Sequence, residues 1–102
     1  MREVIVTFKL FCNWRGATPP VYRLYVDNEL VTERSYIWDN SDYYLIERIP
    51  LYVNPGPHNL YVVNLNPELG TFRVEDFRIN GESRNYREAD SRFVINPDDV
   101  KE

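Results

Sequence analysis

The residues best suited to chemistry lie in the stretch WDNSDYY, Trp38 to Tyr44, where acidic and polar side chains are flanked by aromatic rings. Carboxylate and amide oxygens are ligands that Ca²⁺ prefers, and aromatic rings offer a flat apolar face with polar groups beside it, which suits a sugar. The same composition is also typical of a turn between two strands. The stretch therefore raises three hypotheses, namely a metal site, a sugar-binding surface and a simple turn.

The metal hypothesis is weakened by the spacing of the ligands. An EF-hand loop needs oxygen ligands at its first, third and fifth positions and a glutamate at its twelfth, whereas counting from Asp39 places Tyr43 at the fifth position and Pro50 at the twelfth. A calcium site assembled from separate loops, for instance from Asp39 and Asp42 with Asp27, stays open. Two acids in a polar turn more often serve solvation, so we expect no metal and no other cofactor.

The sugar hypothesis uses the rings as stacking platforms and the acids as acceptors for hydroxyl groups. The candidate ligand-binding residues are Trp14, Trp38, Asp39, Asp42, Tyr43 and Tyr44. Consecutive residues of a strand point to opposite faces, so only one of two neighbouring tyrosines can be buried. We therefore favour the alternative that Trp38 and one of the tyrosines are core residues flanking an acidic turn. The exposed tyrosine is then the contact residue.

Catalysis has little support in the sequence. His58, the only histidine, lies in the tight turn PGPHN, and a general base there needs a nucleophile and an orienting acid from elsewhere. We expect His58 to be a surface turn residue and the single cysteine, Cys12, to be a small core residue. A glycosidase needs two carboxylates in a deep cleft, which a chain of 102 residues has little length to build. We expect no enzymatic activity.

Composition bears on the partners. The net charge is −4 and no run of basic residues is longer than two, so nucleic acid is not an expected partner. Ten of the 12 basic residues are arginine and eight residues are tyrosine, a bias typical of surfaces that contact other proteins. Charged residues interrupt the apolar N-terminal stretch MREVIVTFKLF, which therefore predicts neither a signal peptide nor a membrane span. We expect synthesis in a cytoplasm.

The elements that must position these residues are short strands. No segment has a helical period, and apolar runs are separated by Pro, Gly, Asn and Asp. The predicted strands cover residues 4–12, 21–26, 30–38, 43–53, 59–65, 71–79 and a segment near 82–86. Such a pattern predicts an all-β fold, an antiparallel β-sandwich of jelly-roll-like kind with six to eight short strands.

Two irregularities refine this prediction. Within 71–79 the apolar residues change parity between Val74 and Phe77, so we expect a β-bulge near residues 75–76 that restores a single inward face. Pro50 cannot donate to a strand ladder, which predicts an edge, a bulge or a strand end. The pair Asn80-Gly81 is a strong hairpin signal.

The C-terminal part differs in character from the rest. We expect a sandwich core over residues 1–83 and a polar segment over 84–102, with a possible edge strand at 92–96 and an acidic tail that is mobile or docked on a partner. Arginine and aromatic side chains of this segment are the candidate partner-binding residues. They are Arg84, Tyr86, Arg87, Arg92 and Phe93.

Residues 21–83 resemble two groups of proteins in their pattern of strands and turns. The quoted features are the hairpin at Val26-Asp27-Asn28, the start of a strand at Gly56 to Leu60, and the strand from Phe72 to Gly81. These features are similar to those of small β-sandwich carbohydrate-binding modules, including the calcium-dependent xylan-binding type. The chain also resembles small β-rich proteins of T4-like marine phages, which are often virion components.

These resemblances imply two functions. The first expectation is a non-enzymatic structural or interaction protein, such as a head-decoration or tail-associated protein of a virion, that binds a larger protein assembly or another copy of itself. The alternative is a carbohydrate-binding module that binds a glycan through the loop from Trp38 to Tyr44. We expect no membrane partner.

Overall fold

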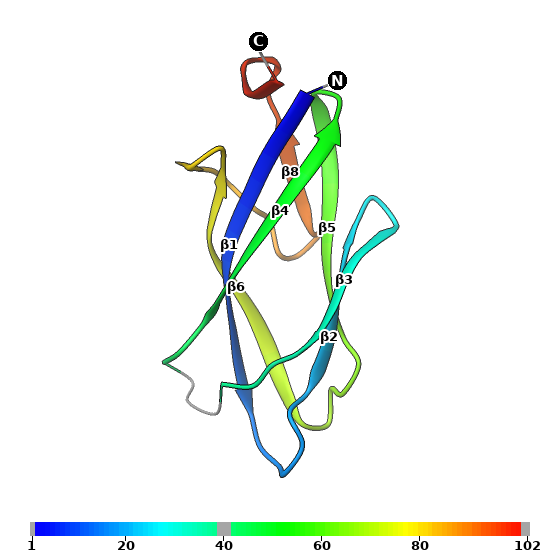
Figure 1. The fold of residues 1–102 in the computed structure, drawn as a ribbon, viewed down its shortest axis with the longest axis vertical. Coiled ribbons are helices and arrows are strands. Elements are labelled where there is room, and N and C mark those ends of the chain that lie inside the picture. The colour runs from blue at the N-terminus through cyan, green and yellow to red at the C-terminus, as the bar shows by residue number, and fades with distance from the viewer. Residues whose placement is uncertain (1, 39–41, 101–102) are drawn as a thin grey trace.

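Two antiparallel sheets of four strands pack face to face in the computed structural model, which describes residues 2–38 and 42–100 (Figure 1). The strands are β1 (Arg2–Trp14), β2 (Val21–Val26), β3 (Glu29–Ser35), β4 (Leu45–Val53), β5 (Gly56–Asn64), β6 (Gly70–Ile79), β7 (Glu82–Ser83) and β8 (Arg92–Ile95). Their order is β4-β1-β6-β7 in one sheet and β3-β2-β5-β8 in the other. The predicted all-β sandwich is confirmed. No helix in the described ranges is long and apolar enough to cross a membrane.

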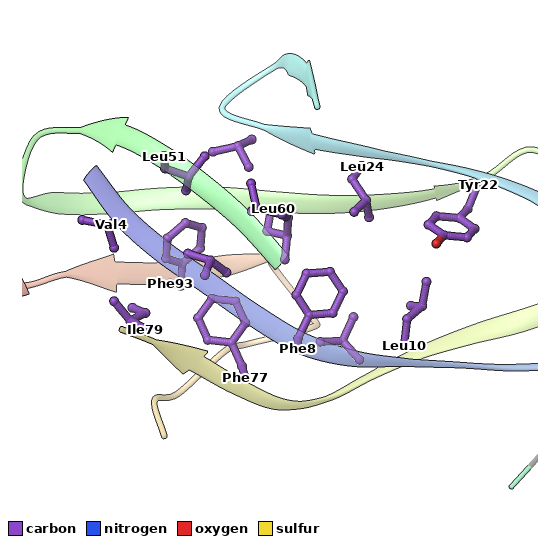
Figure 2. Packing of buried hydrophobic residues seen from close by; sticks show 14 of the residues in the cluster. Val4, Phe8, Leu10, Tyr22, Leu24, Leu51, Leu60, Phe77, Ile79 and Phe93 are labelled. Atoms are coloured by element: carbon purple, nitrogen blue, oxygen red, sulfur yellow. The ribbon is translucent and has the colours of Figure 1, made fainter. Parts of the chain in front are cut away.

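The core lies between the sheets and follows the alternation of the strands. In β1 every second residue from Val4 to Cys12 is buried, because successive side chains of a strand point to opposite faces. The second sheet contributes Tyr22, Leu24 and Leu60 to the core, and these side chains lie opposite those of β1 in Figure 2. The apolar residues that alternate in the sequence of β1 are therefore the residues that form the core.

The predicted bulge in β6 is confirmed. Thr7 pairs with Arg78 and Lys9 pairs with Glu75, so the single residue between them on β1 faces two residues on β6. One of the two is Asp76, whose φ of 52° lies in the left-handed region. The extra residue returns the following side chains to the inner face, and for this reason β6 buries apolar residues on both sides of the bulge.

Pro50 and the pair Asn80-Gly81 lie at the kinds of position that the sequence predicted for them, an edge strand and a hairpin turn. Pro50 lies in β4, the edge strand of its sheet, where it pairs with Ile5. The turn at Asn80-Gly81 joins β6 to β7, which is shorter than the predicted segment because it ends at Ser83.

The C-terminal segment is part of the sandwich. β8 adds Phe93 and Ile95 to the core, so the described fold extends past residue 83, where the sequence pattern placed its end. A short 3-10 helix, η1 (Pro97–Val100), follows and contacts β1. Its Asp99 accepts a hydrogen bond of 2.9 Å from Arg84, so the described part of the acidic tail contacts its own domain.

Candidate binding sites

An aromatic loop joins the two sheets at one end of the sandwich. Residues 36–44 lead from β3 in one sheet to β4 in the other (Figure 1). The residues Trp38, Tyr43 and Tyr44 are 39%, 51% and 39% exposed. The prediction that Trp38 and one of the tyrosines fill the core is therefore wrong, and all three rings face solvent.

Tyr36 takes the core position that the strand pattern predicted for Trp38. β3 ends at Ser35, so the strand alternation stops before it reaches the tryptophan. The ring of Tyr36 is fully buried, and its hydroxyl lies 3.2 Å from the carbonyl oxygen of Leu10 and 3.0 Å from that of Tyr43. These contacts connect the loop to β1 and hold the backbone at Tyr43, where the second group of exposed rings begins.

The exposed rings form one surface together with Phe11 of β1. The centroids of Trp38 and Tyr43 are 5.6 Å apart in an edge-to-face arrangement, and those of Tyr44 and Phe11 are 5.3 Å apart. Both distances lie in the range of favourable aromatic pairs. We call Phe11, Trp38, Tyr43 and Tyr44 the aromatic surface. It includes a shallow pocket of about 420 Å³ lined by its loop rings and by Asp42.

Two cations lie over this surface. The ammonium group of Lys9 is 4.7 Å from the centroid of Tyr44, and the guanidinium of Arg73 is 4.4 Å from that of Phe11. Cations at these distances interact favourably with the ring faces. Phe11, Lys9 and Arg73 were not among the predicted site residues. The sequence did contain a signal for Phe11. The residues that alternate from Val4 to Cys12 fill the inner face of β1, so Phe11 must lie on the outer face, where its large ring is not part of the core.

Trp14 supports the loop from behind. Its indole N–H donates a hydrogen bond of 2.5 Å to the carbonyl of Trp38, and its ring packs against the core. Trp14 is therefore not a second exposed platform but a residue that positions the first. Gly70 of β6 lies directly opposite, and a Cβ atom there would be 2.5 Å from the Cβ of Trp14. Only a residue without a side chain fits at that point.

The acidic candidates of the loop are placed in part. Asp42 is exposed and lines the pocket, whereas Asp39 lies outside the described residues. In residues 2–38 and 42–100 no three His, Cys, Asp or Glu side chains come together as a metal-binding group.

A second concavity lies beside β8. We call it the arginine groove; it has a volume of about 460 Å³ and is lined by Arg84, Asn85, Arg87, Arg92, Phe93, Val94 and Asn96. Three of these residues precede β8 and four lie in it or just after it, and they meet because residues 84–91 cross from β7 in one sheet to β8 in the other (Figure 1).

The predicted partner-binding residues have different places around this groove. Phe93 is 1% exposed and belongs to the core. Tyr86 is half-buried, stacks on Phe77 at 5.1 Å and donates a hydrogen bond of 2.6 Å to the carbonyl of Leu60. These two side chains therefore serve the packing of the sandwich.

The three arginines differ in how far they are exposed to solvent. Arg84 is half-buried and bound to Asp99, which holds the pKa of the Asp99 carboxyl below its ordinary value. Arg87 and Arg92 are exposed, and only they present their charge to solvent.

A buried carboxylate on β4 connects the two sheets by hydrogen bonds to β2 and β3. Glu47 of β4 is 3% exposed and accepts hydrogen bonds of 2.5 Å from the hydroxyl of Tyr22 and 3.0 Å from Arg34 of β3. Burial, with the hydrogen bond to Glu47, raises the pKa of Tyr22 far above its ordinary value. No sequence pattern pointed to this contact, which links the edge strands of both sheets.

Cys12 and His58 complete the groups considered for chemistry. Burial raises the pKa of the Cys12 thiol to about 11, so this core thiol stays protonated at neutral pH. His58 is not a surface turn residue, because β5 already begins at Gly56 and the ring is largely buried.

The ring of His58 lies between two acceptors. Its Nδ1 is 2.5 Å from Oδ2 of Asp27, and its Nε2 is 2.8 Å from the carbonyl oxygen of Asn54. Both nitrogens must donate to satisfy these contacts, which favours the charged imidazolium. Burial lowers the pKa of His58, but the bonds to Asp27 and Asn54 outweigh this effect and the pKa is raised. His58 therefore clamps the β2–β3 turn to the β4–β5 turn.

No protein-family model matches this chain, and comparisons with curated proteins and with solved structures give no match either.

Proposed function

We propose that this protein is a non-enzymatic binding protein that attaches to a larger protein assembly, of the kind formed by a virion shell or tail, through the aromatic surface. The observation that carries the proposal is the exposure of Trp38, Tyr43 and Tyr44 side by side in one loop. Exposed aromatic rings grouped in this way are typical of protein contacts, since burying them on binding removes a large apolar area from water.

The support behind the rings strengthens the proposal. Tyr36 and Trp14 tie both sides of the loop to the body of the sandwich, so the rings are held in place before a partner arrives. Binding then costs little conformational entropy. Lys9 and Arg73 each pair with an acid of β6, Asp76 and Glu75, and lie over the rings of Tyr44 and Phe11, so they support these rings by cation–π contact.

Co-sedimentation tests this proposal. Particles from the native source are stripped of this protein and incubated with purified wild type, with Trp38→Ala or with Tyr52→Ala, and then sedimented. Tyr52 is the matched control, because it is an exposed aromatic residue on β4 with no place in the aromatic surface. We expect wild type and Tyr52→Ala in the pellet and Trp38→Ala in the supernatant. Wild type that stays in the supernatant overturns the proposal.

A second candidate function is saccharide binding at the same loop. It is favoured by the shape of the pocket, where the rings of Trp38, Tyr43 and Tyr44 form apolar walls and the carboxylate of Asp42 stands beside them. Walls of this kind with a few polar groups suit a ligand that has both apolar faces and hydroxyl groups.

Tryptophan fluorescence tests the second candidate. Titration with xylohexaose and with cellohexaose, each with and without CaCl₂, should change the emission of wild type and leave that of Trp38→Phe unchanged. Emission that does not respond up to about 10 mM sugar, where even weak binding is detected, excludes this function.

A further inference from the structure

The outer edge of β8 has unpaired backbone groups. Leu60 of β5 donates to the carbonyl of Ser91, and Pro57, which has no N–H, lies opposite Val94. Since hydrogen-bonded pairs alternate along an antiparallel ladder, β5 binds β8 through the residues on either side of Val94. The N–H and the carbonyl of Val94 therefore point away from the sheet.

A neighbouring segment confirms this direction and leaves a gap beside it. Arg92, two residues before Val94, directs its backbone outward as well and exchanges hydrogen bonds of 3.0 and 3.2 Å with Arg87. If this pairing continued, Asn85 would lie opposite Val94, but the isolated bridge at Arg87 is the only pairing found along this side of β8 in the described part of the chain. Asn85 and Val94 instead line the arginine groove, which opens where the pairing stops.

Charge identifies what fits the gap. Arg84 is neutralised by Asp99, and Arg87 lies 3.2 Å from Asp90 on the exposed surface. No ion pair of Arg92 occurs within the described ranges, although its side chain lines the groove. The groove thus combines an unbalanced guanidinium with a backbone donor and acceptor. A polypeptide in extended conformation satisfies the donor and the acceptor together, whereas inorganic phosphate has no extended backbone to pair along the strand edge.

We propose that the arginine groove binds an extended acidic segment of a partner protein, which adds to the outer edge of β8 as a further strand. The backbone of the segment pairs with Val94, and its carboxylates contact Arg92. Strand addition of this kind takes affinity from main-chain hydrogen bonds and specificity from the side chains beside them. The groove is separate from the aromatic surface, so this inference stands or falls independently of the proposed function.

Peptide binding tests the inference. The probe is a short peptide of alternating Glu and Val with blocked ends, titrated into the full chain while amide chemical shifts are recorded by NMR. We expect saturable binding with shifts at Val94 and slower hydrogen exchange of its amide. The same peptide methylated at alternate backbone nitrogens, so that its bonded edge is blocked, and a peptide of alternating Lys and Val should each bind at least about tenfold more weakly.

Two variants locate the site. Arg92→Glu should weaken the Glu-Val peptide at least about tenfold, and the matched control Arg48→Glu, an exposed arginine on β4 in the other sheet, should leave binding unchanged. Val94→Pro removes the outward N–H at an edge position that tolerates proline and should weaken the Glu-Val peptide at least about tenfold, with thermal unfolding verifying the fold.

Three results overturn the inference. The first is the absence of binding at about 1 mM peptide. The second is equal binding of the backbone-methylated peptide. The third is full competition by inorganic phosphate at the concentration of the peptide, which would show a simple anion site.

Discussion

The protein has two groups of aromatic rings with similar distances between the rings and opposite surroundings. In the interior cluster, Phe77 lies 6.4 Å from Phe8, 5.3 Å from Phe93 and 5.1 Å from Tyr86. In the aromatic surface the ring distances are 5.3 and 5.6 Å. Ring spacing therefore does not distinguish a core from a contact surface. What distinguishes them is which elements supply the rings.

The interior cluster is built from both sheets. Phe8 and Phe77 come from β1 and β6, and Phe93 comes from β8 of the other sheet, so the sandwich encloses them when the sheets pack. The aromatic surface comes from a loop and from the outer face of β1, where no second layer covers it. The first group should determine stability and the second should determine binding, and the following predictions separate these roles.

The largest expected effect is on the interior. Phe77→Ala should lower the free energy of unfolding by about 3 to 5 kcal/mol, because it removes a buried ring that contacts three others. Urea unfolding followed by circular dichroism measures the change. A loss below about 1 kcal/mol would mean that the cluster can collapse around the gap and contributes little.

Gly70→Ala should affect both groups. A methyl group at Gly70 lies against the backbone of Asn13 and the Cβ of Trp14, so we expect a loss of about 1 to 3 kcal/mol in the free energy of unfolding. Since Trp14 holds the carbonyl of Trp38, the shift should also weaken binding at the aromatic surface. Gly81→Ala, where no atom lies within 4 Å of the added Cβ, is the steric comparison, although its positive φ adds some strain of its own. Binding unchanged in Gly70→Ala would show that the loop does not depend on Trp14.

A pH-dependent effect is expected at the border of the interior cluster, where His58 lies 5.9 Å from Phe93. The pKa of His58 is raised in the folded state, so its contribution is complete below the unfolded pKa of about 6.5 and is lost as the pH rises through the folded pKa. The free energy of unfolding should therefore fall across this window. Urea unfolding at a series of pH values measures the fall, which Asp27→Asn should reduce.

The smallest effect on stability is expected for the aromatic surface. Trp38→Ala should change the free energy of unfolding by no more than about 1 kcal/mol, because the ring is partly exposed and its main contact is one aromatic pair. The same variant should lose particle binding in the sedimentation test. A loss as large as that of Phe77→Ala would place Trp38 with the interior and would remove the contrast.

The strands were predictable from the sequence, whereas the sites were predictable only in part. Alternation in β1 and the parity change in β6 report directly on which face is buried, so the core and the bulge followed from the residue types. The exposure of Trp38 could not be predicted in this way. It depends on the residue at which β3 ends, and the sequence around Ser35 has no distinctive signal for the end of a strand.

The arginine groove was predictable only as a list of residues. The C-terminal arginines stand out in the sequence, but the ion pair of Arg84 with Asp99 and the phase of the β5–β8 pairing do not. That phase depends on contacts between residues about 30 positions apart, such as Leu60 with Ser91. Phe93 was assigned to a partner for the same reason, since a short apolar run does not reveal which of its residues points inward.

The position of Pro50 in an edge strand has a consequence for solubility. Exposed strand edges invite uncontrolled pairing between molecules, and proline interrupts such pairing because it has no N–H to donate. The other edges of the described sandwich are guarded differently, by a register shift and charged residues in β3, by the two-residue length of β7 and by the bridge at Arg87 beside β8. A molecule protected in this way can accept one short strand without templating the next, so association should end at a defined complex and not proceed to fibres.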